Sequence, residues 1–326
     1  MANLTDKEVN LITTAAVYTG VGLVSLISNL LLFLTIVRHE ALRDRKEFLL
    51  TAGMAMVDML CYGLATIALG VYRIPKLLDG SYKLLTTRRS CFLVFGQFLF
   101  ISTYGASNFM LFVVSFDRFL SVSWPLFYLG LSRTYAYCML ACVFLIAALE
   151  TSLMAIRLWS VEEPVGMLCY GGNTVLSVDY QLFHKQNSLL AVVSVLMYAA
   201  ALISLKCRQN REQASAQLSE KLAWQQKFTR AVGVCVFLTF LLVVVPLTAY
   251  RVLVYYPKLY LMLSGWFWLL NCLNPFCNLV VFLAKQKDLR KGFKTMVNCK
   301  TLPPSLALWH TTNAAAVTVK LQTIEK

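Results

Sequence analysis

The sequence has few charged residues and very few histidines for its length. Of its 326 residues, 14% are charged and three are histidine. A soluble domain carries about a quarter charged residues, so this composition argues against an ordinary soluble domain. With so few histidines and no H-E-x-x-H motif, the chain offers no histidine-based metal cluster. We therefore expect that the protein is not an enzyme.

The sequence has long apolar runs instead. Hydrophobic residues make up 58% of the chain, and about 20 mainly apolar residues are enough to cross a bilayer as a helix. None of the runs has the alternating pattern of an outer-membrane barrel strand. We therefore predict an all-α membrane protein, with a seven-transmembrane helix bundle over residues 12–284. The seven runs are Ile12–Val37, Phe48–Tyr72, Cys91–Phe116, Thr134–Ile156, Asn187–Leu205, Ala231–Tyr250 and Leu259–Ala284.

The excess of positive charge lies in the loops beside these runs. A net charge of +14 would suit nucleic-acid binding, but beside membrane spans it reports orientation instead. With the N-terminus outside, the inner segments near the membrane hold eighteen of the thirty Lys and Arg residues and the outer segments ten. The sequence predicts an extracellular segment at 1–11, a cytoplasmic tail at 300–326 and no nucleic-acid partner.

The first eleven residues contain both acids and a lysine rather than a basic stretch. We therefore expect the first apolar run to act as its own signal anchor. Asn3, in Asn3-Leu4-Thr5, is an N-glycosylation acceptor on the predicted outer side, although such triplets also occur by chance. An outer segment this short cannot fold into a hormone-binding domain. We expect a ligand that is a small organic molecule or a short peptide.

An acid and an arginine stand together where the third run should meet water. Because charges are costly in lipid, this pair suggests function rather than packing. Residues 117–128 read D-R-F-L-S-V-S-W-P-L-F-Y, which resembles D-R-Y-x-x-V-x-x-P-x-x-Y, the helix 3 signature of rhodopsin-like G-protein-coupled receptors. The matching residues are Asp117, Arg118, Val122, Pro125 and Tyr128, while Phe119 replaces the usual Tyr.

This resemblance implies a plasma-membrane receptor. It would bind its ligand in the outer half of the bundle and activate a heterotrimeric G protein through the Asp117–Arg118 end of helix 3. The resemblance also assigns further switch positions, namely Tyr198, Phe240, Pro246, Asn274 and Pro275.

The sequence departs from the family at several of its switch positions. Val244 stands where a tryptophan is usual, Asn278 replaces a tyrosine, and Leu190 replaces a proline. Gln226 stands where many relatives have an acid on helix 6, so no charge lock can form there. Asp117 is then left to hold Arg118 at rest.

The resemblance also implies an ion site and a disulfide bond. Asp58, Ser107, Asn271 and Asn274 could surround a Na⁺ ion, because a hard cation prefers several oxygen ligands around a carboxylate. The alternative is a neutral Asp58 that is hydrogen-bonded to the asparagines. The disulfide would join Cys91 to Cys169 across an oxidising compartment. Cys91 precedes Arg118 by 27 residues, two more than usual, so we expect a local difference where helix 3 starts.

A basic amphipathic segment follows the seventh run. Residues 285–299 resemble the family's eighth helix, which lies along the inner leaflet. Cys299 is then a palmitoylation candidate, with a free cytosolic thiol as the alternative. The threonines of the tail suggest phosphorylation, and with it a kinase and arrestin as partners. A solvated linker is the simpler interpretation.

The ligand side lacks two features of well-known receptor groups. Phe100 stands where amine receptors have their helix 3 aspartate, which argues against biogenic amines. The seventh run has no lysine, so retinal cannot form a Schiff base there. We expect Glu150 to pair with Arg157 or, alternatively, to meet a cationic ligand group. Aromatic cavities with few polar groups are typical ligand sites, although aromatics also serve as packing or interface anchors. The pocket candidates are Gln97, Phe100, Tyr104, Glu150, Arg157, Tyr250, Arg251, Trp266 and Trp268.

Finer details resemble the Srsx-type serpentine chemoreceptors of nematodes. They include L-R-D-R-K-E at Leu42–Glu47, V-D-M-L-C at Val57–Cys61 and the basic stretch before Cys91. This branch would imply chemical sensing. The rival classes are a seven-span transporter or channel, and a ligand-binding receptor that is uncoupled from G proteins. A transporter would show paired repeats and matching broken helices, and the sequence shows no internal repeat.

Overall fold

The structure is a computed structural model. It describes residues 6–209, 216–246, 248–249 and 256–298 of the chain. Side chains are described over 8–207, 226–246, 248–249, 256, 266–267 and 269–298.

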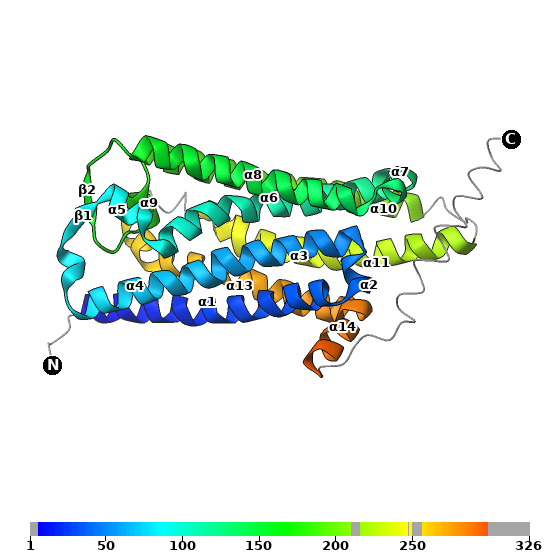
Figure 1. Cartoon of the computed structure of the whole chain (residues 1–326), viewed down its shortest axis with the longest axis horizontal. Coiled ribbons are helices and arrows are strands. Elements are labelled where there is room, and N and C mark those ends of the chain that lie inside the picture. Colours follow the sequence, from blue (N-terminus) through cyan, green and yellow to red (C-terminus); the bar gives the residue numbers. More distant parts are fainter. Residues whose placement is uncertain (1–5, 210–215, 247, 250–255, 299–326) are drawn as a thin grey trace.

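The described part of the chain contains seven long helical segments, which run side by side along one direction (Figure 1). Six of them are long and apolar enough to cross a membrane, and the seventh contains the shorter apolar stretch Leu269–Lys285. The predicted all-α bundle of seven helices is therefore confirmed. Helix 2 comprises α3, η1 and α4, and helix 6 comprises α11 and η3. The segments are α1 (Asp6–Arg38), α3 (Lys46–Asp58), η1 (Met59–Ala65), α4 (Thr66–Leu78), α6 (Phe95–Ser123), α8 (Arg133–Leu158), α10 (Ser177–Gln209), α11 (Ala216–Thr239), η3 (Phe240–Val244) and α13 (Pro257–Lys285).

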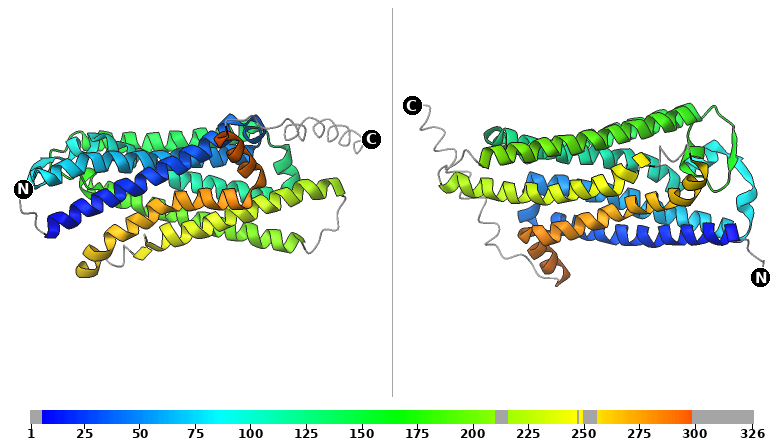
Figure 2. Two further views of the ribbon diagram at one scale, coloured as in Figure 1. Left: turned by 90° about the horizontal axis from the view of Figure 1, so that it is seen from below. Right: turned by 180° about the vertical axis from the view of Figure 1, so that it is seen from behind.

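Short elements gather at the two ends of the bundle. One end, here called the hairpin end, carries η2 (Ser81–Lys83), β1 (Leu85–Thr87), α5 (Arg88–Leu93), β2 (Pro164–Gly166) and α9 (Gly171–Thr174). The opposite end, here called the arginine end, carries α2 (Glu40–Arg43), α7 (Pro125–Gly130) and α14 (Lys287–Val297). Helix α14 turns away from the direction of α13 (Figure 2).

The hairpin end is closed by an antiparallel pair of strands and a disulfide bond. β1 pairs with β2, with Leu85 opposite Gly166. The expected bond between Cys91 and Cys169 is present, with 5.1 Å between the two Cα atoms. Arg73 of α4 donates hydrogen bonds to the carbonyl oxygens of Leu168 and Cys169 at 2.9 and 3.0 Å. The loop before α10 is thereby fixed to helix 2 as well as to the start of helix 3.

Two helix boundaries differ from the limits of the apolar runs. Cys91 lies in the separate short helix α5, and the chain breaks at Val94 before α6 begins, which accounts for the long spacing to Arg118. Helix α10 begins at Ser177, ten residues before the apolar run at Asn187. An apolar run marks only the part of a helix that faces lipid or core, so a polar first section of α10 escapes such a count.

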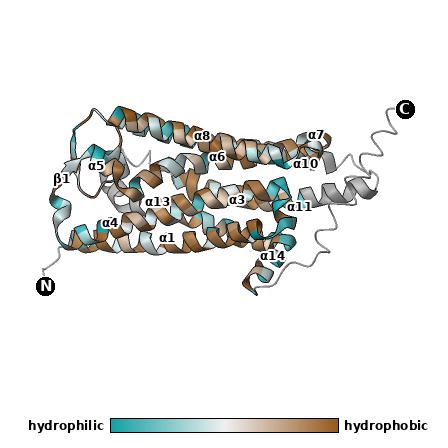
Figure 3. Cartoon of the chain, in the orientation of Figure 1, coloured by the Kyte–Doolittle hydropathy of each residue, from teal (hydrophilic) through white to brown (hydrophobic). Residues whose placement is uncertain are grey.

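The outer surface of the bundle is apolar along its length. Leu145, Ile156 and Leu196 are 69%, 70% and 63% exposed although they lie within the spans. Brown, hydrophobic colour covers the middle of the helices, and teal gathers toward their ends (Figure 3). Such a surface requires lipid around it.

The packed core lies between α1, α3, α6, α11 and α13. It runs to the arginine end, where the rings of Phe48, Phe228 and Phe282 pack together. Helices 1 and 2 approach each other closely at Gly63 of η1, because a Cβ added there would lie 2.8 Å from the Cα of Leu26. The core therefore holds helices 2, 3, 6 and 7 in one piece around the end of helix 3.

Candidate functional site: a buried arginine cluster

Asp117 and Arg118 form an ion pair in the last turns of α6. Both side chains are only 1% exposed. The Nη2 of Arg118 is paired with Asp117 Oδ2, and its Nε donates to the same oxygen at 3.0 Å. Within the described residues, Arg118 Nη1 and Asp117 Oδ1 have no hydrogen-bond partner. A buried charge pair with unsatisfied atoms is costly to fold around, which indicates that it is kept for a use other than stability.

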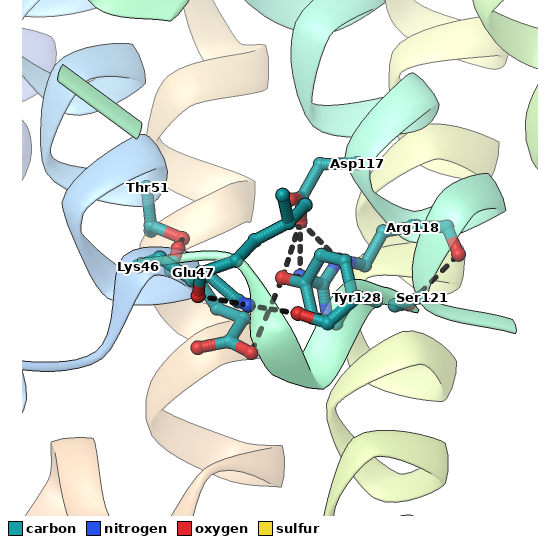
Figure 4. Close-up of polar contacts among 8 residues, drawn as sticks. Lys46, Glu47, Thr51, Asp117, Arg118, Ser121 and Tyr128 are labelled. Atoms are coloured by element: carbon teal, nitrogen blue, oxygen red, sulfur yellow. Dashed lines mark hydrogen bonds and ion pairs between the residues drawn. The ribbon is translucent and has the colours of Figure 1, made fainter. Parts of the chain in front are cut away.

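Tyr128 of α7 ties this pair to helix 2 (Figure 4). Its hydroxyl accepts a hydrogen bond from Arg118 Nη2 at 2.9 Å and lies 3.2 Å from both Glu47 Oε1 and Asp117 Oδ2. Burial raises the pKa of Tyr128 well above its usual range, so the phenol stays neutral and can accept and donate at once. We call Glu47, Asp117, Arg118 and Tyr128 the arginine cluster.

Lys46 fixes α7 in position from the other side. Its ammonium donates to the carbonyl oxygens of Tyr128 and, at 2.8 Å, of Leu131. It also lies 3.9 Å from the centre of the Tyr128 ring. Two charged neighbours in sequence, Lys46 and Glu47, therefore hold the backbone and the hydroxyl of one tyrosine.

The two residues before Lys46 make contacts with two other elements. Asp44 pairs with Arg133 at the start of α8 at 2.7 Å, and Arg45 pairs with Asp288 of α14 at 2.9 Å. Four successive residues, 44–47, thus connect the loop between helices 1 and 2 to α7, α8 and α14. A partly exposed ion pair is worth little alone, but the two pairs together fix the loop around the arginine cluster.

Helix 6 reaches Arg118 through an aromatic ring. The ring centre of Phe228 lies 4.7 Å from Arg118 Cζ, a distance at which a cation and a ring attract each other. Phe228 also packs edge-on against Phe48 at 5.4 Å and lies 6.3 Å from Phe282. Phe282 lies one helical turn beyond Asn278, the residue that replaces the expected tyrosine. Helix 6 thus contacts Arg118 through an aromatic ring, which also links it to helices 2 and 7.

The other expected switch residues lie along helices 5, 6 and 7. Tyr198 is buried, and a Cβ on Gly233 of helix 6 would lie 2.9 Å from its ring. Phe240 begins the π-helical turn η3, which ends two residues before the buried Pro246. Such turns often occur at functional kinks. Asn274 accepts a hydrogen bond from Thr239 at 3.0 Å, and Pro275 lies inside α13.

The expected ion-site residues are only partly joined by hydrogen bonds. Asp58 is 4% exposed, and Ser107 donates to its Oδ1 at 2.6 Å. Asn271 is 2% exposed, and its Oδ1 has no partner within the described residues. Asn274 bonds to helix 6 instead. A π-helical turn, η1, begins directly after Asp58.

Three of the expected pocket residues lie together at the hairpin end. Gln97, Phe100 and Tyr104 follow one another along α6. Gln97 and Tyr104 are 1% and 0% exposed, and the rings of Phe100 and Tyr104 are 5.3 Å apart. Tyr104 also lies 5.8 Å from Phe183 of α10. Trp266 is 63% exposed and so does not belong to this buried group.

The expected pair between Glu150 and Arg157 is wrong. Arg157 pairs with Asp179 at 2.6 Å, and Glu150 accepts a hydrogen bond from Gln186. The reason is the early start of α10, which brings Asp179 and Gln186 against α8. These two residues lay outside the fifth apolar run, although a helical spacing of polar residues in 179–187 could have revealed them.

Several expected sites lie outside the described residues. They are the glycosylation site Asn3, the palmitoylation site Cys299, the tail at 300–326, Tyr250, Arg251 and the side chain of Trp268.

A seven-helix bundle with an Asp-Arg pair at the end of its third helix and a disulfide at the opposite end defines the class of G-protein-coupled receptors. The family described as serpentine type 7TM GPCR chemoreceptor Srsx matches residues 22–297. The match covers most of the chain, so the protein belongs to this family and is a multi-pass plasma-membrane receptor, as the finer sequence details predict. The family is one of receptors and not of enzymes. A comparison with curated proteins finds no significant match.

Proposed function

We propose that this chemoreceptor binds a small molecule or a short peptide at its hairpin end and activates a heterotrimeric G protein at its arginine end. The proposal is carried by one observation. Arg118 is buried and held at once by α6 through Asp117, by α7 through Tyr128 and by helix 6 through Phe228. Asp117 lies on the same helix as Arg118, so a shift of α7 or of helix 6 would remove one of the contacts that hold the arginine from outside.

The surface beside the arginine cluster supports a docking role. Helix α7 exposes Leu126 and Phe127 at 74% and 61%, and Trp124 before it is 56% exposed. Exposed apolar side chains beside charged groups are typical of a protein interface. A G protein that docks there would contact α7 directly, so its binding and the release of Tyr128 from Arg118 would be coupled.

The orientation in the membrane follows from chemistry in this proposal. A disulfide bond forms in an oxidising compartment, so the hairpin end, with Cys91 and Cys169, faces outside. The bias of Lys and Arg toward the loops of the arginine end agrees with this orientation. The N-terminus is then extracellular and the C-terminus cytoplasmic.

We also propose that Na⁺ binds beside Asp58 in the resting state. A carboxylate, the hydroxyl of Ser107 and the unpartnered amide oxygen of Asn271 are the oxygen donors that such a hard cation prefers. An ion here would balance a negative charge inside the membrane, where an unpaired charge is costly. The chain would supply these donors from helices 2, 3 and 7, with Asp58 and Asn271 both buried.

A second candidate function is binding without G-protein coupling. Val244 and Asn278 replace a tryptophan and a tyrosine that relatives use in activation. The aromatic contact of Phe282 with Phe228 argues for the coupled receptor, because it links helices 6 and 7 close to Arg118.

Guanine-nucleotide exchange in membranes tests the proposal. Wild type, Arg118→Ala and Asp117→Asn would be compared on a panel of G proteins, with pooled volatile and peptide ligands. Arg43→Ala is the control, because Arg43 is an exposed cation outside the arginine cluster. We expect Arg118→Ala to abolish exchange and Asp117→Asn to raise its basal rate.

Three outcomes distinguish the candidates. Exchange that depends on Arg118 supports the coupled receptor and names its G-protein class. Ligand binding without exchange on any G protein would favour the uncoupled receptor. Exchange that persists in Arg118→Ala at normal expression would overturn the role given to the arginine cluster.

A further inference from the structure

A groove lies between α8 and α10 toward the hairpin end, with a volume of about 190 Å³. Glu150 and Gln186 line it at one end, and Arg157 and Asp179 at the other. Leu153 and Leu182 also line it and are 49% and 55% exposed. The groove therefore opens on the outside of the bundle, and Phe183 connects it to the buried aromatic group around Tyr104.

Glu150 is an acid within a membrane-spanning helix and has no cationic partner among the described residues. It stands eight residues before the end of α8 at Leu158, which is roughly 12 Å along the helix. Its Oε1 accepts from the neutral amide of Gln186. An ionisable group in a membrane segment is costly and is expected to have a functional partner.

The arginine that could have neutralised Glu150 is already engaged. Arg157 pairs with Asp179 at 2.6 Å, and Asp179 is buried. Turning Arg157 toward Glu150 would leave the carboxylate of Asp179 buried without its cation, which is strongly unfavourable. A positive partner for Glu150 would therefore come from outside the described residues.

The walls between the two polar ends are apolar. Met154 and Phe183 line the groove, and the ring of Phe183 also lies against Tyr104. A cavity of about 150 Å³ with apolar walls is known to take a benzene ring. The groove therefore has room for one aromatic ring with a short alkyl chain, and its acid selects a positive charge at the end of that chain.

We propose that this groove binds a small arylalkyl ammonium ion, with Glu150 as its counter-ion and Gln186 as a second polar anchor. The inference deepens the proposed function, because it names a ligand class for the receptor. Phe100 argues against an amine site on helix 3, because amine receptors have their aspartate at that position. The charge is supplied from helix 4 instead.

Helix 3 makes room for this arrangement at Gly105. A Cβ added at Gly105 would lie 3.0 Å from Glu150 Oε2 and 3.3 Å from the Phe183 ring. The carboxylate and the ring are thus both set against a position that has no side chain. Any larger residue there would displace the groups that the ligand contacts.

The test is equilibrium binding of 2-phenylethylammonium to the purified full-length receptor without a G protein, with the uncharged 2-phenylethanol as the comparison probe. We expect saturable binding of the ammonium and none of the alcohol. Glu150→Gln should weaken binding at least tenfold, and Glu150→Asp should recover part of it. Glu162→Gln, an exposed acid at the hairpin end, is the matched control and should bind as wild type does.

A second variant keeps the test decisive if Glu150→Gln fails to fold. Leu153→Trp would fill the groove from its open side and leave the carboxylate in place, so it should abolish binding in a folded receptor. Equal binding by wild type and Glu150→Gln would overturn the proposal, as would the absence of any binding of the ammonium to wild type. Neither result would affect Arg118-dependent nucleotide exchange, so the proposed function is tested separately by that assay.

Discussion

The hydroxyl of Tyr128 lies 3.2 Å from the carboxylate of Glu47, although 81 residues separate them in the chain. The same hydroxyl accepts from Arg118 at 2.9 Å. Glu47 and Arg118 are therefore connected through the neutral phenol of Tyr128 by two hydrogen bonds in series, here called a relay. A relay of this kind can be broken at either link, which makes the position of α7 decisive for the state of Arg118.

The first prediction concerns the acid end of this relay. Glu47→Gln keeps the shape of the side chain and removes its charge, so the hydrogen bond from Tyr128 weakens. A hydrogen bond to a charged group contributes about 1.5–3 kcal/mol, and about 1.4 kcal/mol corresponds to a tenfold change. We expect basal nucleotide exchange to rise about tenfold. Glu40→Gln, an exposed acid in α2, should leave it unchanged, and equal effects of the two variants would remove Glu47 from the mechanism.

The second prediction concerns the hydroxyl itself. Tyr128→Phe deletes the acceptor of Arg118 and the donor to Glu47 together, and leaves buried groups unsatisfied at a cost of about 1–3 kcal/mol. We expect a lower melting temperature and a higher basal exchange rate. The double variant with Glu47→Gln should be no more active than Tyr128→Phe alone, because Tyr128→Phe already removes the hydrogen bond that Glu47→Gln weakens. Full additivity would show that Glu47 and Tyr128 act independently. Tyr137→Phe, an exposed tyrosine of α8, is the control.

The third prediction concerns the contact from helix 6. Phe228→Leu removes the ring that lies over Arg118, an interaction worth about 0.5–2 kcal/mol. Helix 6 should then move away from Arg118 more readily, and basal exchange per folded receptor should rise severalfold. Phe237→Leu on the same helix, where the ring is 59% exposed, should have no such effect. A variant that only loses thermal stability, with unchanged basal exchange, would assign Phe228 to packing alone.

The sequence was sufficient to predict the seven helices and the Asp117–Arg118 pair, because each is signalled by residues close together in the chain. The disulfide joins residues 78 apart, and it was predicted from the resemblance to the receptor family. Long apolar runs report lipid-facing helices directly. The family's Arg118 motif extends to Tyr128, so the tyrosine could be expected beside the arginine.

The partners of these residues could not be predicted in the same way. Glu47 lies at the start of α3, where an acid is ordinary since it favours a helix N-terminus. Only the packing of helices 2 and 3 brings it to Tyr128. Phe228 reads as one more core aromatic, and its contact with Arg118 depends on how α11 is rotated. Arg157 pairs with Asp179 and Glu150 with Gln186 because α10 begins early, and helix ends are the least certain part of any prediction from sequence.

The fourth prediction concerns the bond between Cys91 and Cys169. It closes a loop of 78 residues, for which the chain-entropy estimate gives roughly 4.5 kcal/mol of stabilisation. Replacing either cysteine by serine should lower the melting temperature strongly and reduce the amount of receptor at the cell surface. The two single variants and the double variant should behave alike, because each removes the same bond. Cys138→Ser, at an exposed free cysteine, is the control, and a Cys91→Ser variant as stable as this control would exclude a structural role for the bond.

The last prediction concerns the packing of helices 1 and 2. Gly63 in η1 lies so close to α1 that a Cβ would stand 2.8 Å from the Cα of Leu26. Backbone atoms cannot rotate away as the end of a side chain can, so Gly63→Ala must push the two helices apart. Overpacking of this kind costs about 1–3 kcal/mol.

Gly20→Ala on α1 is the matched control for Gly63→Ala. A Cβ there would meet nothing within 4 Å, and alanine favours a helix over glycine by roughly 1 kcal/mol. The same substitution should therefore destabilise the receptor at Gly63 and leave it unchanged or slightly stabilised at Gly20. Thermal unfolding in detergent measures both effects. Because Asp58 directly precedes η1, the displacement at Gly63 should also weaken any effect of Na⁺ on the melting temperature, whereas Gly20→Ala should preserve it. If Gly63→Ala melts at the temperature of wild type, helices 1 and 2 are not packed as closely as this structure has them.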